Sequence, residues 1–350
     1  MEEAVAVINV GIVGYGYAGR NFHSYLVGLA EGLHLEAVVS SREDKRRQVL
    51  AERGCRAVAS IDELLADPRI DLVVLATPHD THCALAVRAL EAGKHVVTDK
   101  VMCLSVQEAD AMIAAAKRAG RMLSVFQNRR WDWDYQTVRS VLAGGLIGRP
   151  YLFESAVMGH GTPRGWRGDP VRSGGVLYDW GAHLLDQALQ LVPAKVVEVF
   201  CHVGYVRPGS AIGDFGKLDL RFADGTLFEV CVGHLALQGK PRWYILGDQG
   251  SLVSIGRDPQ EAAMNRGDID AASEDPGLRA RVRTRVAGLP AEIVLESVRS
   301  SWKSYYQNIS DHLHGKAELA VTAESVRRSI MVYDAAARAV ADGRSVAVDI

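Results

Sequence analysis

The sequence predicts an α/β protein: a doubly wound parallel sheet, then an α+β region with an open, mostly antiparallel sheet. Three observations support this fold class. Short apolar runs alternate with helical patterns over roughly the first 125 residues. Beyond them, strand-like runs follow one another with hairpin signals. At about 150 residues per domain, a chain of 350 residues suggests two domains, predicted at 1–125 and 126–350.

Composition narrows the class of protein. Hydrophobic residues make up 48% of the chain, which is enough for sizeable cores. The formal net charge is -2, without a long run of one sign, and this argues against a nucleic-acid binder. The five cysteines are scattered and form no CxxC pair, so we expect neither a disulfide framework nor a structural zinc or other metal site. A reducing cytoplasm fits this pattern.

The N-terminal residues do not have the pattern of a targeting signal. Glu2 and Glu3 precede an apolar run over 4–13, which lacks a positively charged region before it and leads directly into glycines. No run reaches the ~20 apolar residues of a membrane span. We therefore expect a cytoplasmic protein without a membrane partner.

The first strand leads into a glycine-rich turn. The β-branched run over 5–13 is followed by Gly14-Tyr15-Gly16-Tyr17-Ala18-Gly19, and a helical pattern begins at Arg20. In a strand–turn–helix unit the first glycine permits the tight turn, the second lets a pyrophosphate approach, and the third lets helix and strand pack closely. With a second strand at 35–39, the motif predicts a dinucleotide site rather than a glycine turn without a ligand.

The residues after the second strand predict which dinucleotide binds. An NAD enzyme commonly has an acid here for the ribose 2′-hydroxyl, whereas an arginine can take the 2′-phosphate of NADP. The chain has Ser41 and Arg42, while Glu36 lies inside the strand and Asp44 in the following helix. The pattern favours NADP over NAD. An ordinary helix that begins with charged residues would have the same sequence pattern.

Strands and helices continue to alternate, which predicts a Rossmann-type domain. Capping boxes at Ser60-x-x-Glu63 and Ser105-x-x-Glu108 each open a helix. Further strands are expected at 70–76, 95–97 and 122–126, and helices at 82–92 and from 105 to Gly120. Ligands bind at the carboxyl ends of such strands. There the chain has Thr77-Pro78, Asp99-Lys100 and Gln127-Asn128-Arg129, with His82 opening the helix after Thr77-Pro78.

The pattern changes in the second half of the chain. A linking helix is expected at 134–143, and strands at 151–158, 196–203, 217–222, 226–232 and 243–246. Asp224-Gly225 is a hairpin signal. Residues 159–175 form a Gly/Pro/Arg-rich loop, and 257–285 are polar with little period, so we expect a long, mobile surface excursion there. Two helices close the chain at 302–314 and 323–341.

The stretch over 173–190 holds the strongest acid/base candidates. Asp179, His183 and Asp186 recur at spacings of four and three inside an apolar run of helical period, so they share one face of a helix. An imidazole with a carboxylate one turn away is suited to general acid/base catalysis. The same spacing also fits a solvated helix face, and this stretch alone does not decide between the two.

Taken together, these motifs resemble the Gfo/Idh/MocA family of NAD(P)-dependent oxidoreductases along nearly the whole chain. The resemblance rests on the three glycines, on Asp99-Lys100 and on Gly174-Gly175…Asp179…Gly181…His183…Asp186. The runs over 126–132, 166–167 and 178–183 look most like the branch that contains NADP-dependent scyllo-inositol dehydrogenases. One departure is Val101, where the family usually has proline after the lysine. The Lys100–Val101 bond is therefore either trans, or cis at a cost of roughly 2.5–4 kcal/mol.

The resemblance implies hydride transfer between NADP(H) and a secondary hydroxyl or ketone of a polyol or sugar. The implied catalytic residues are Lys100, Asp179 and His183, and Asn128 and Arg129 join Asp179 and His183 in binding substrate. The implied cofactor residues are Gly14, Tyr15, Gly16, Tyr17, Ala18, Gly19, Ser41, Arg42, Thr77, Pro78, His82, Asp99, Lys100, Gln127, Trp166 and Arg167. One face of the second sheet would cover the active site and the other would form a homodimer or a dimer of dimers, and the 323–341 helix can pack back on the first domain.

Three alternatives stay open on sequence grounds, because fold does not fix function. A non-catalytic NAD(P)-binding sensor or co-repressor would use the same scaffold, but it would not need Lys100 or His183. A nicotinamide-dependent glycosidase would keep its cofactor through each turnover and release a cleaved sugar. A reductase of a different carbonyl, such as a ketosugar or an imine, would share the same three catalytic residues.

Overall fold

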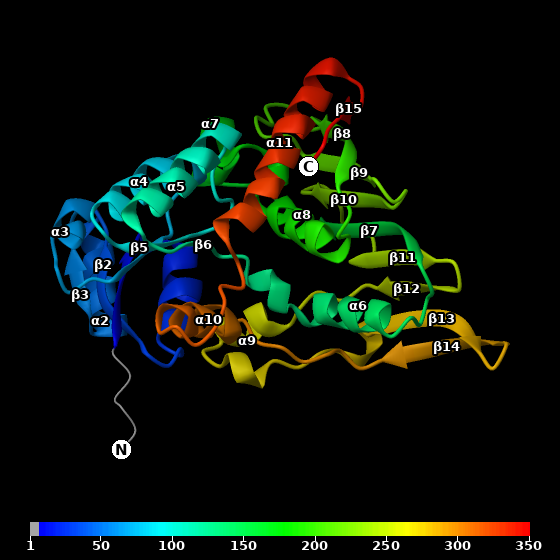
Figure 1. Ribbon diagram of the computed structural model, residues 1–350, viewed down its shortest axis with the longest axis horizontal. Helices are drawn as coiled ribbons and strands as arrows, with labels where there is room; N and C mark the ends of the chain where they lie inside the picture. The colour runs from blue at the N-terminus through cyan, green and yellow to red at the C-terminus, as the bar shows by residue number, and fades with distance from the viewer. Residues whose placement is uncertain (1–6) are drawn as a thin grey trace. The chain divides into compact units, whose positions relative to one another are not determined.

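The computed structural model describes residues 7–350, which form two compact units (Figure 1). The first unit holds the chain up to Asn128 together with Trp302–Ile330, and the second holds Arg129–Ser301 with Met331–Ile350. The predicted boundary at residue 125 lies close to the division at Asn128. Residues 302–330, however, were predicted to belong to the second domain, apart from the suggested return of the 323–341 helix, and they belong to the first unit.

The described part of the first unit contains a six-stranded parallel sheet in the order β3-β2-β1-β4-β5-β6. Its strands are β1 Ile8–Val13, β2 Leu33–Val39, β3 Arg56–Val58, β4 Leu72–Leu75, β5 His95–Thr98 and β6 Leu123–Val125. Strand β4 is buried along its whole length, as a parallel strand covered on both faces must be. The predicted Rossmann-type sheet is therefore confirmed, while the predicted start of its first strand at Val5 lies outside the described residues.

The helices between these strands begin and end where local sequence signals predict. They are η1 Ala18–His23, α1 Ser24–Val27, α2 Glu43–Arg53, α3 Ile61–Leu65, η2 His79–Thr81, α4 His82–Glu91 and α5 Val106–Ala119. Ser60 and Ser105 accept hydrogen bonds from the backbone N–H groups of Glu63 and Glu108, which confirms both capping boxes. Helices α4 and α5 lie side by side (Figure 1).

Two details of the first unit differ from prediction. The helix after the glycine turn begins at Ala18 rather than Arg20, and its first part is π-helical. Strand β3 was not predicted, because its three residues are too short to show a period and only one strand pairs with it.

Aromatic packing explains why residues 302–330 belong to the first unit. Helix α10, Lys303–Leu313, follows Trp302, whose ring stacks on Phe22 with the ring centroids 5.6 Å apart. Tyr305 packs edge-on against Phe126 at 4.9 Å, and its hydroxyl lies 2.8 Å from Ser124 Oγ. These side chains complete the core under η1 and β6.

The second unit is built on a nine-stranded sheet within the described residues, in the order β14-β13-β12-β11-β7-β10-β9-β8-β15. The strands are β7 Pro150–Met158, β8 Val196–Gly204, β9 Phe215–Phe222, β10 Leu227–Gly233, β11 Trp243–Gly247, β12 Gly250–Ser254, β13 Ala280–Val286, β14 Leu289–Leu295 and β15 Val346–Ala347. Only β7 and β10 pair in parallel, and the hairpin at Asp224-Gly225 joins β9 to β10. The predicted open, mostly antiparallel sheet is confirmed.

Helix α8 is the helix of the second unit that matters most for function. It spans Trp180–Leu191, directly after the short η5 at Val176–Tyr178, and it contacts β7 and β10. The remaining helices of this unit are η3 Asn128–Trp131 at the division, α6 Trp133–Ala143, η4 Gly165–Gly168, α7 Pro170–Ser173, α9 Gln260–Asn265, η6 Ile269–Ala271 and η7 Pro276–Leu278. Helix α11, Ala323–Asp342, runs from the first unit into the second. No described helix combines the length and the apolar character that crossing a bilayer requires.

The predicted surface excursion over 257–285 is wrong in its main feature. The segment contains α9, η6, η7 and β13, and Ala263, Met264 and Ile269 are buried. The prediction failed because these apolar residues are few and widely spaced among polar ones, so no helical or strand period is visible. The loop over 159–175 likewise contains η4 and α7.

Candidate active site

The glycine turn after β1 forms a cradle in which each glycine has a different reason to lack a side chain. Gly14 has a φ of +102°, and a Cβ on it would lie 2.5 Å from the carbonyl oxygen of Ala76. A Cβ on Gly19 would lie 2.1 Å from the carbonyl oxygen of Gly14. At Gly16, no described residue other than its two chain neighbours has an atom within 4 Å of that position. The turn is therefore closed at Gly14 and Gly19 and open at Gly16, which fits the approach of a dinucleotide pyrophosphate to the N-terminus of η1.

The two tyrosines of this turn point to different surroundings. Tyr15 is buried, and its hydroxyl donates to Glu52 Oε2 at 2.9 Å, so it ties the turn to α2. Arg20 binds both oxygens of the same carboxylate, and together these partners lower the pKa of Glu52 to about 2. Tyr17 is half exposed, and its ring packs edge-on against Phe22. Only Tyr17 therefore presents its ring to solvent beside Gly16 and Ala18.

The residues after β2 carry an exposed positive charge. The guanidinium of Arg42 binds the carboxylate of Asp44, with Nε 3.0 Å from Oδ1, and this pairing lowers the pKa of Asp44. Arg46 donates to the carbonyl oxygens of Ser40 and Ser41 at 2.8 Å and 2.9 Å and so fixes the course of this loop. Glu36, the other acid near this loop, lies on β2, and its carboxylate is paired with Arg56 on the neighbouring strand β3.

The loops after β4 and β5 are joined through His82. Its ring is completely buried, with Nδ1 2.8 Å from the carbonyl oxygen of Val101 and Nε2 2.9 Å from that of Thr77. Burial lowers the pKa of His82. The Lys100–Val101 peptide bond is cis, which is the second of the two alternatives raised by the missing proline. The His82 ring thus lies between Thr77-Pro78 and the Lys100–Val101 segment at the carboxyl ends of neighbouring strands, and in its neutral form it donates to one of the two carbonyl oxygens.

Asp99 contacts both the Lys100 backbone and the buried His23. Its Oδ1 accepts from the backbone N–H of Lys100 at 2.8 Å, and its Oδ2 lies 3.7 Å from His23 Nε2. Burial would raise the pKa of Asp99, but His23 and Lys100 outweigh it and lower the pKa to about 2. Nδ1 of His23 lies 2.7 Å from the hydroxyl of Tyr306. Asp99 is therefore a carboxylate at neutral pH that orients the Lys100 backbone.

The polar residues that follow β6 are buried. Gln127 and Asn128 are each 2% exposed. The amide nitrogen of Asn128 has no hydrogen-bond partner within residues 7–350, so it is a donor available to a ligand.

In the second unit, two glycines in the left-handed region lead into the acid/base candidates. Gly174 and Gly175 have φ values of 83° and 110°. Asp179 then stands at the N-terminus of α8, and His183 follows on the first turn, 5% exposed and edge-on to the ring of Trp180. Asp186 is buried rather than solvated, because Arg130 binds both of its carboxylate oxygens at 2.8 Å and 2.7 Å.

A pocket of about 280 Å³ opens at the start of α8 and belongs entirely to the second unit. Asp179 and Trp180 line it together with residues of the 159–167 loop and of the segment after β10, and Arg167 lies 3.9 Å from the Asp179 carboxylate. His183 is not among the lining side chains. The structure therefore brings Asp179 and Arg167 together, which the sequence predicted separately, and adds Trp180, His160, His234 and Arg257, which it did not.

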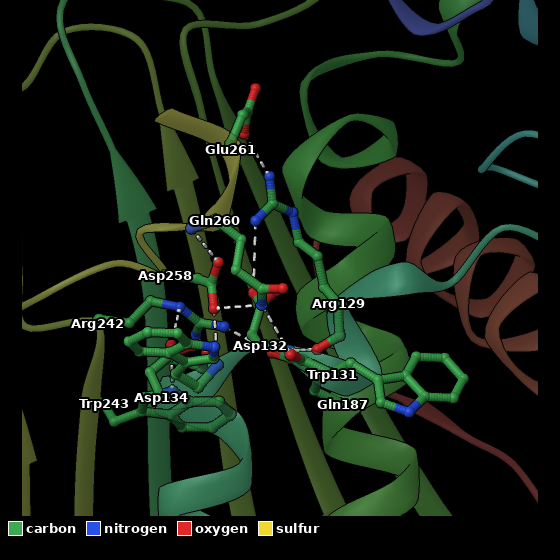
Figure 2. A network of polar contacts seen from close by, with 12 residues as sticks. Arg129, Trp131, Asp132, Asp134, Gln187, Arg242, Trp243, Asp258, Gln260 and Glu261 are labelled. Atoms are coloured by element: carbon green, nitrogen blue, oxygen red, sulfur yellow. Dashed lines mark hydrogen bonds and ion pairs between the residues drawn. The ribbon is translucent and has the colours of Figure 1, made fainter. Parts of the chain in front are cut away.

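Arg129, a predicted substrate residue, is the centre of a buried charge network (Figure 2). Its guanidinium lies 4.1 Å from the ring centre of Trp180 and is paired with Glu261 at 2.8 Å and Asp132 at 3.4 Å. Its carbonyl oxygen accepts from Gln187 on α8.

The network extends from Arg129 to the segment before α9. Arg242 binds Asp134 at 2.9 Å and Gln187 at 2.6 Å. Asp258 accepts from the backbone N–H groups of Trp133 and Gln260. Burial raises the pKa of Asp132 well above its usual range and that of Asp258 to about 6. No local sequence signal could have paired residues this far apart in the chain.

Comparisons with known proteins cover both units. Residues 8–127 match the oxidoreductase family described as having an NAD-binding Rossmann fold, and residues 135–253 match the GFO/IDH/MocA C-terminal domain. The uncharacterized oxidoreductase YdgJ of Escherichia coli is 38% identical over 329 residues, covering 90% of this chain and 91% of the relative. The scyllo-inositol 2-dehydrogenase (NADP(+)) IolW of Bacillus subtilis is 28% identical, with coverage of 99% and 97%.

A solved structure has the same fold as this chain. The putative oxidoreductase yvaA of Bacillus subtilis superposes with a TM-score of 0.93 at 27% identity, covering 99% of this chain and all of that one. A family match on each unit and a relative of 38% identity along nearly the full length decide the relationship. The chain belongs to the Gfo/Idh/MocA family of NAD(P)-dependent oxidoreductases.

Proposed function

We propose that this protein transfers a hydride between NADP(H) and a secondary hydroxyl or ketone of a polyol or sugar of the inositol type. The observation that carries the proposal is the start of α8, where Asp179 and Trp180 line a pocket and His183 lies one turn further along. A carboxylate accepts hydrogen bonds from hydroxyl groups, and an indole ring offers an apolar face to a sugar ring. These are the groups that a polyol requires.

Each catalytic candidate has a distinct role in this proposal. The nicotinamide supplies the hydride acceptor or donor when it is bound. His183 takes the hydroxyl proton during oxidation and returns it during reduction, since an imidazole titrates near neutral pH. Lys100 donates a hydrogen bond to the reacting oxygen and stabilises negative charge on it. Asp179 binds a neighbouring hydroxyl group or orients the imidazole.

The preference for NADP over NAD is part of the proposal. Arg42 stands after β2 with its guanidinium exposed, and the 2′-phosphate would compete with Asp44 for it. The names of two scyllo-inositol 2-dehydrogenases of Bacillus subtilis specify different cofactors, NADP(+) for IolW and NAD(+) for the other, so the proposed preference depends on Arg42. We also propose that the cofactor contacts the glycine turn and the following residues: Ser41, Thr77, Pro78, Gln127, Trp166 and Arg167.

The proposal is tested with a panel of inositols, aldoses and ketosugars, each with NADP and with NAD, read at the nicotinamide absorbance band. We expect stoichiometric reduction of NADP by at least one polyol, and His183→Ala to lower kcat/KM for it by about 10²–10⁴. His202→Ala, at an exposed histidine on β8, is the matched control. A His183→Ala protein with unchanged kcat/KM would exclude the acid/base role, and a large preference for NAD would exclude the reading of Ser41 and Arg42.

We also propose that the second sheet forms a homodimer, or a dimer of dimers, through one face. A groove crosses β7, β8, β9 and β10, and its charged residues are already paired, with Lys217 lying 3.0 Å from Glu229 and 3.2 Å from Asp219. Paired charges can be covered by a second copy without leaving a lone buried ion. Light scattering after gel filtration measures the mass, and a monomeric protein at micromolar concentration would contradict the proposal.

A further inference from the structure

The pocket at the start of α8 has more positive than negative side chains. Arg167, Arg257, His160 and His234 line it, against the single carboxylate of Asp179. Burial lowers the pKa of His234, so that ring is neutral at pH 7. Two guanidinium groups, those of Arg167 and Arg257, therefore face one carboxylate.

The two arginines differ in their partners. Arg167 lies 3.9 Å from Asp179 and covers the ring of Trp166, so its charge is balanced inside the pocket. Arg257 makes no hydrogen bond or ion pair within residues 7–350, and its guanidinium lies 5.9 Å from the ring centre of Trp180. One positive charge in the pocket therefore lacks a counter-charge.

Arg257 is held in place by the residue that follows it. The carboxylate of Asp258 accepts from the backbone N–H of Trp133 at 2.7 Å, from that of Gln260 at 2.8 Å and from Gln260 Nε2 at 3.0 Å. These contacts anchor the segment between β12 and α9 to the start of α6. Figure 2 shows Asp258 beside Gln260. An anchored backbone reduces the conformational freedom that a guanidinium loses on binding a ligand.

We propose that this pocket takes a sugar or polyol that carries an anionic group, a carboxylate or a phosphate, and that Arg257 binds this group. Guanidinium groups bind both anions through paired, charge-assisted hydrogen bonds. Trp180 faces the ring of the ligand, and Asp179 accepts from its hydroxyl groups. That the ligand is a substrate rests on the proposed function, whereas its binding in this pocket does not.

The first experiment measures binding in the presence of NADP by isothermal titration calorimetry. The probes are D-glucose, D-glucuronate and D-glucose 6-phosphate, which differ at C6, and the corresponding galactose series. We expect at least one acid to bind about tenfold or more tightly than its neutral partner. Arg257→Gln should abolish this preference, Arg257→Lys should retain part of it, and Arg285→Gln, at an exposed arginine on β13, should leave it unchanged.

The glucuronate and 6-phosphate arms show which anion the pocket takes. The proposal is overturned if no anionic sugar in either series binds more tightly than the neutral sugar. It is also overturned if Arg257→Gln weakens the binding of anionic and neutral sugars equally. Turnover with NADP is measured on the same sugars. Preferential acid binding without any nicotinamide reduction would refute the proposed hydride transfer and leave the anion site standing. Turnover of neutral polyols, with no preference for anionic sugars, would refute the anion site and leave the proposed hydride transfer standing.

Discussion

Replacing Gly16 by alanine should separate cofactor binding from stability. Apart from its chain neighbours, no residue in the described range 7–350 has an atom within 4 Å of a Cβ at Gly16, and the φ of Gly16 lies outside the left-handed region, so the fold has room for the methyl group. Because alanine restricts the unfolded chain more than glycine does, we expect an unfolding free energy unchanged or raised by up to about 1 kcal/mol. The same methyl group occupies the space through which a pyrophosphate would approach the backbone.

The magnitude of the binding loss follows from the hydrogen bonds at stake. A hydrogen bond from a backbone N–H to a charged group contributes about 1.5–3 kcal/mol, and losing one of them raises Kd by about 10- to 150-fold. We expect Gly16→Ala to raise the Kd of NADPH within this range, measured by titrating the fluorescence of the reduced nicotinamide. Urea unfolding followed by circular dichroism gives the stability of the same protein.

Gly19→Ala is the matched comparison within the same turn. Its Cβ would lie 2.1 Å from the carbonyl oxygen of Gly14, more than 1 Å inside an ordinary contact of 3.4 Å, and backbone atoms cannot rotate away. We expect this variant to lose about 1–3 kcal/mol or more of stability. A Gly16→Ala protein that binds NADPH as wild type does, or that is destabilised as much as Gly19→Ala, would refute the assignment of the open side of the turn to the cofactor.

Two further predictions concern the charges of the second unit. Asp186→Asn should cost about 3–5 kcal/mol in urea unfolding, because it removes a buried carboxylate whose charge balances the Arg130 guanidinium, a side chain that is only 11% exposed. Glu198→Gln, in the exposed pair with Arg221, should cost about 0.2–1 kcal/mol. Equal losses in the two variants would contradict the value expected for Asp186. Asp258 has a pKa of about 6 in the folded protein, above its unfolded value of about 3.9, so the folded state binds more protons and stability falls as pH rises from about 4 to 6. Between about pH 4 and 6, the free energy of unfolding of wild type should therefore fall relative to that of Asp258→Asn, as measured by unfolding at each pH. A difference between the two proteins that does not change with pH would contradict the raised pKa.

The part of the fold that could be predicted is the part set by neighbouring residues. The strand β4 is a continuous apolar run, and the capping serines lie three residues before the glutamates they pair with. The glycine turn combines spacing with a strand before it and a helix after it. Each of these signals lies within about one turn or one strand, where periodicity and capping are decisive.

What could not be predicted depends on partners far apart in the chain. Trp302 and Phe22 stack although nearly the whole chain lies between them, and nothing local in either residue indicates the other. The charge network around Asp258 places several ionisable groups in the interior, against the usual exposure of such residues. At the candidate site the same limit holds: Asp179 and Arg167 could be named from motifs, but Arg257 lies in a segment without any period.

The course of the chain between the two units has a consequence for how the protein is made. Trp302, Tyr305 and Tyr306 are almost completely buried in the first unit, yet they are encoded near the end of the message. During synthesis the glycine turn, β1 and β6 leave the ribosome long before these rings do. Domains at the start of a chain generally fold first. Here the first unit lacks these three rings of its core until residues 129–301 have been translated, so we expect its native core to be completed only late in synthesis.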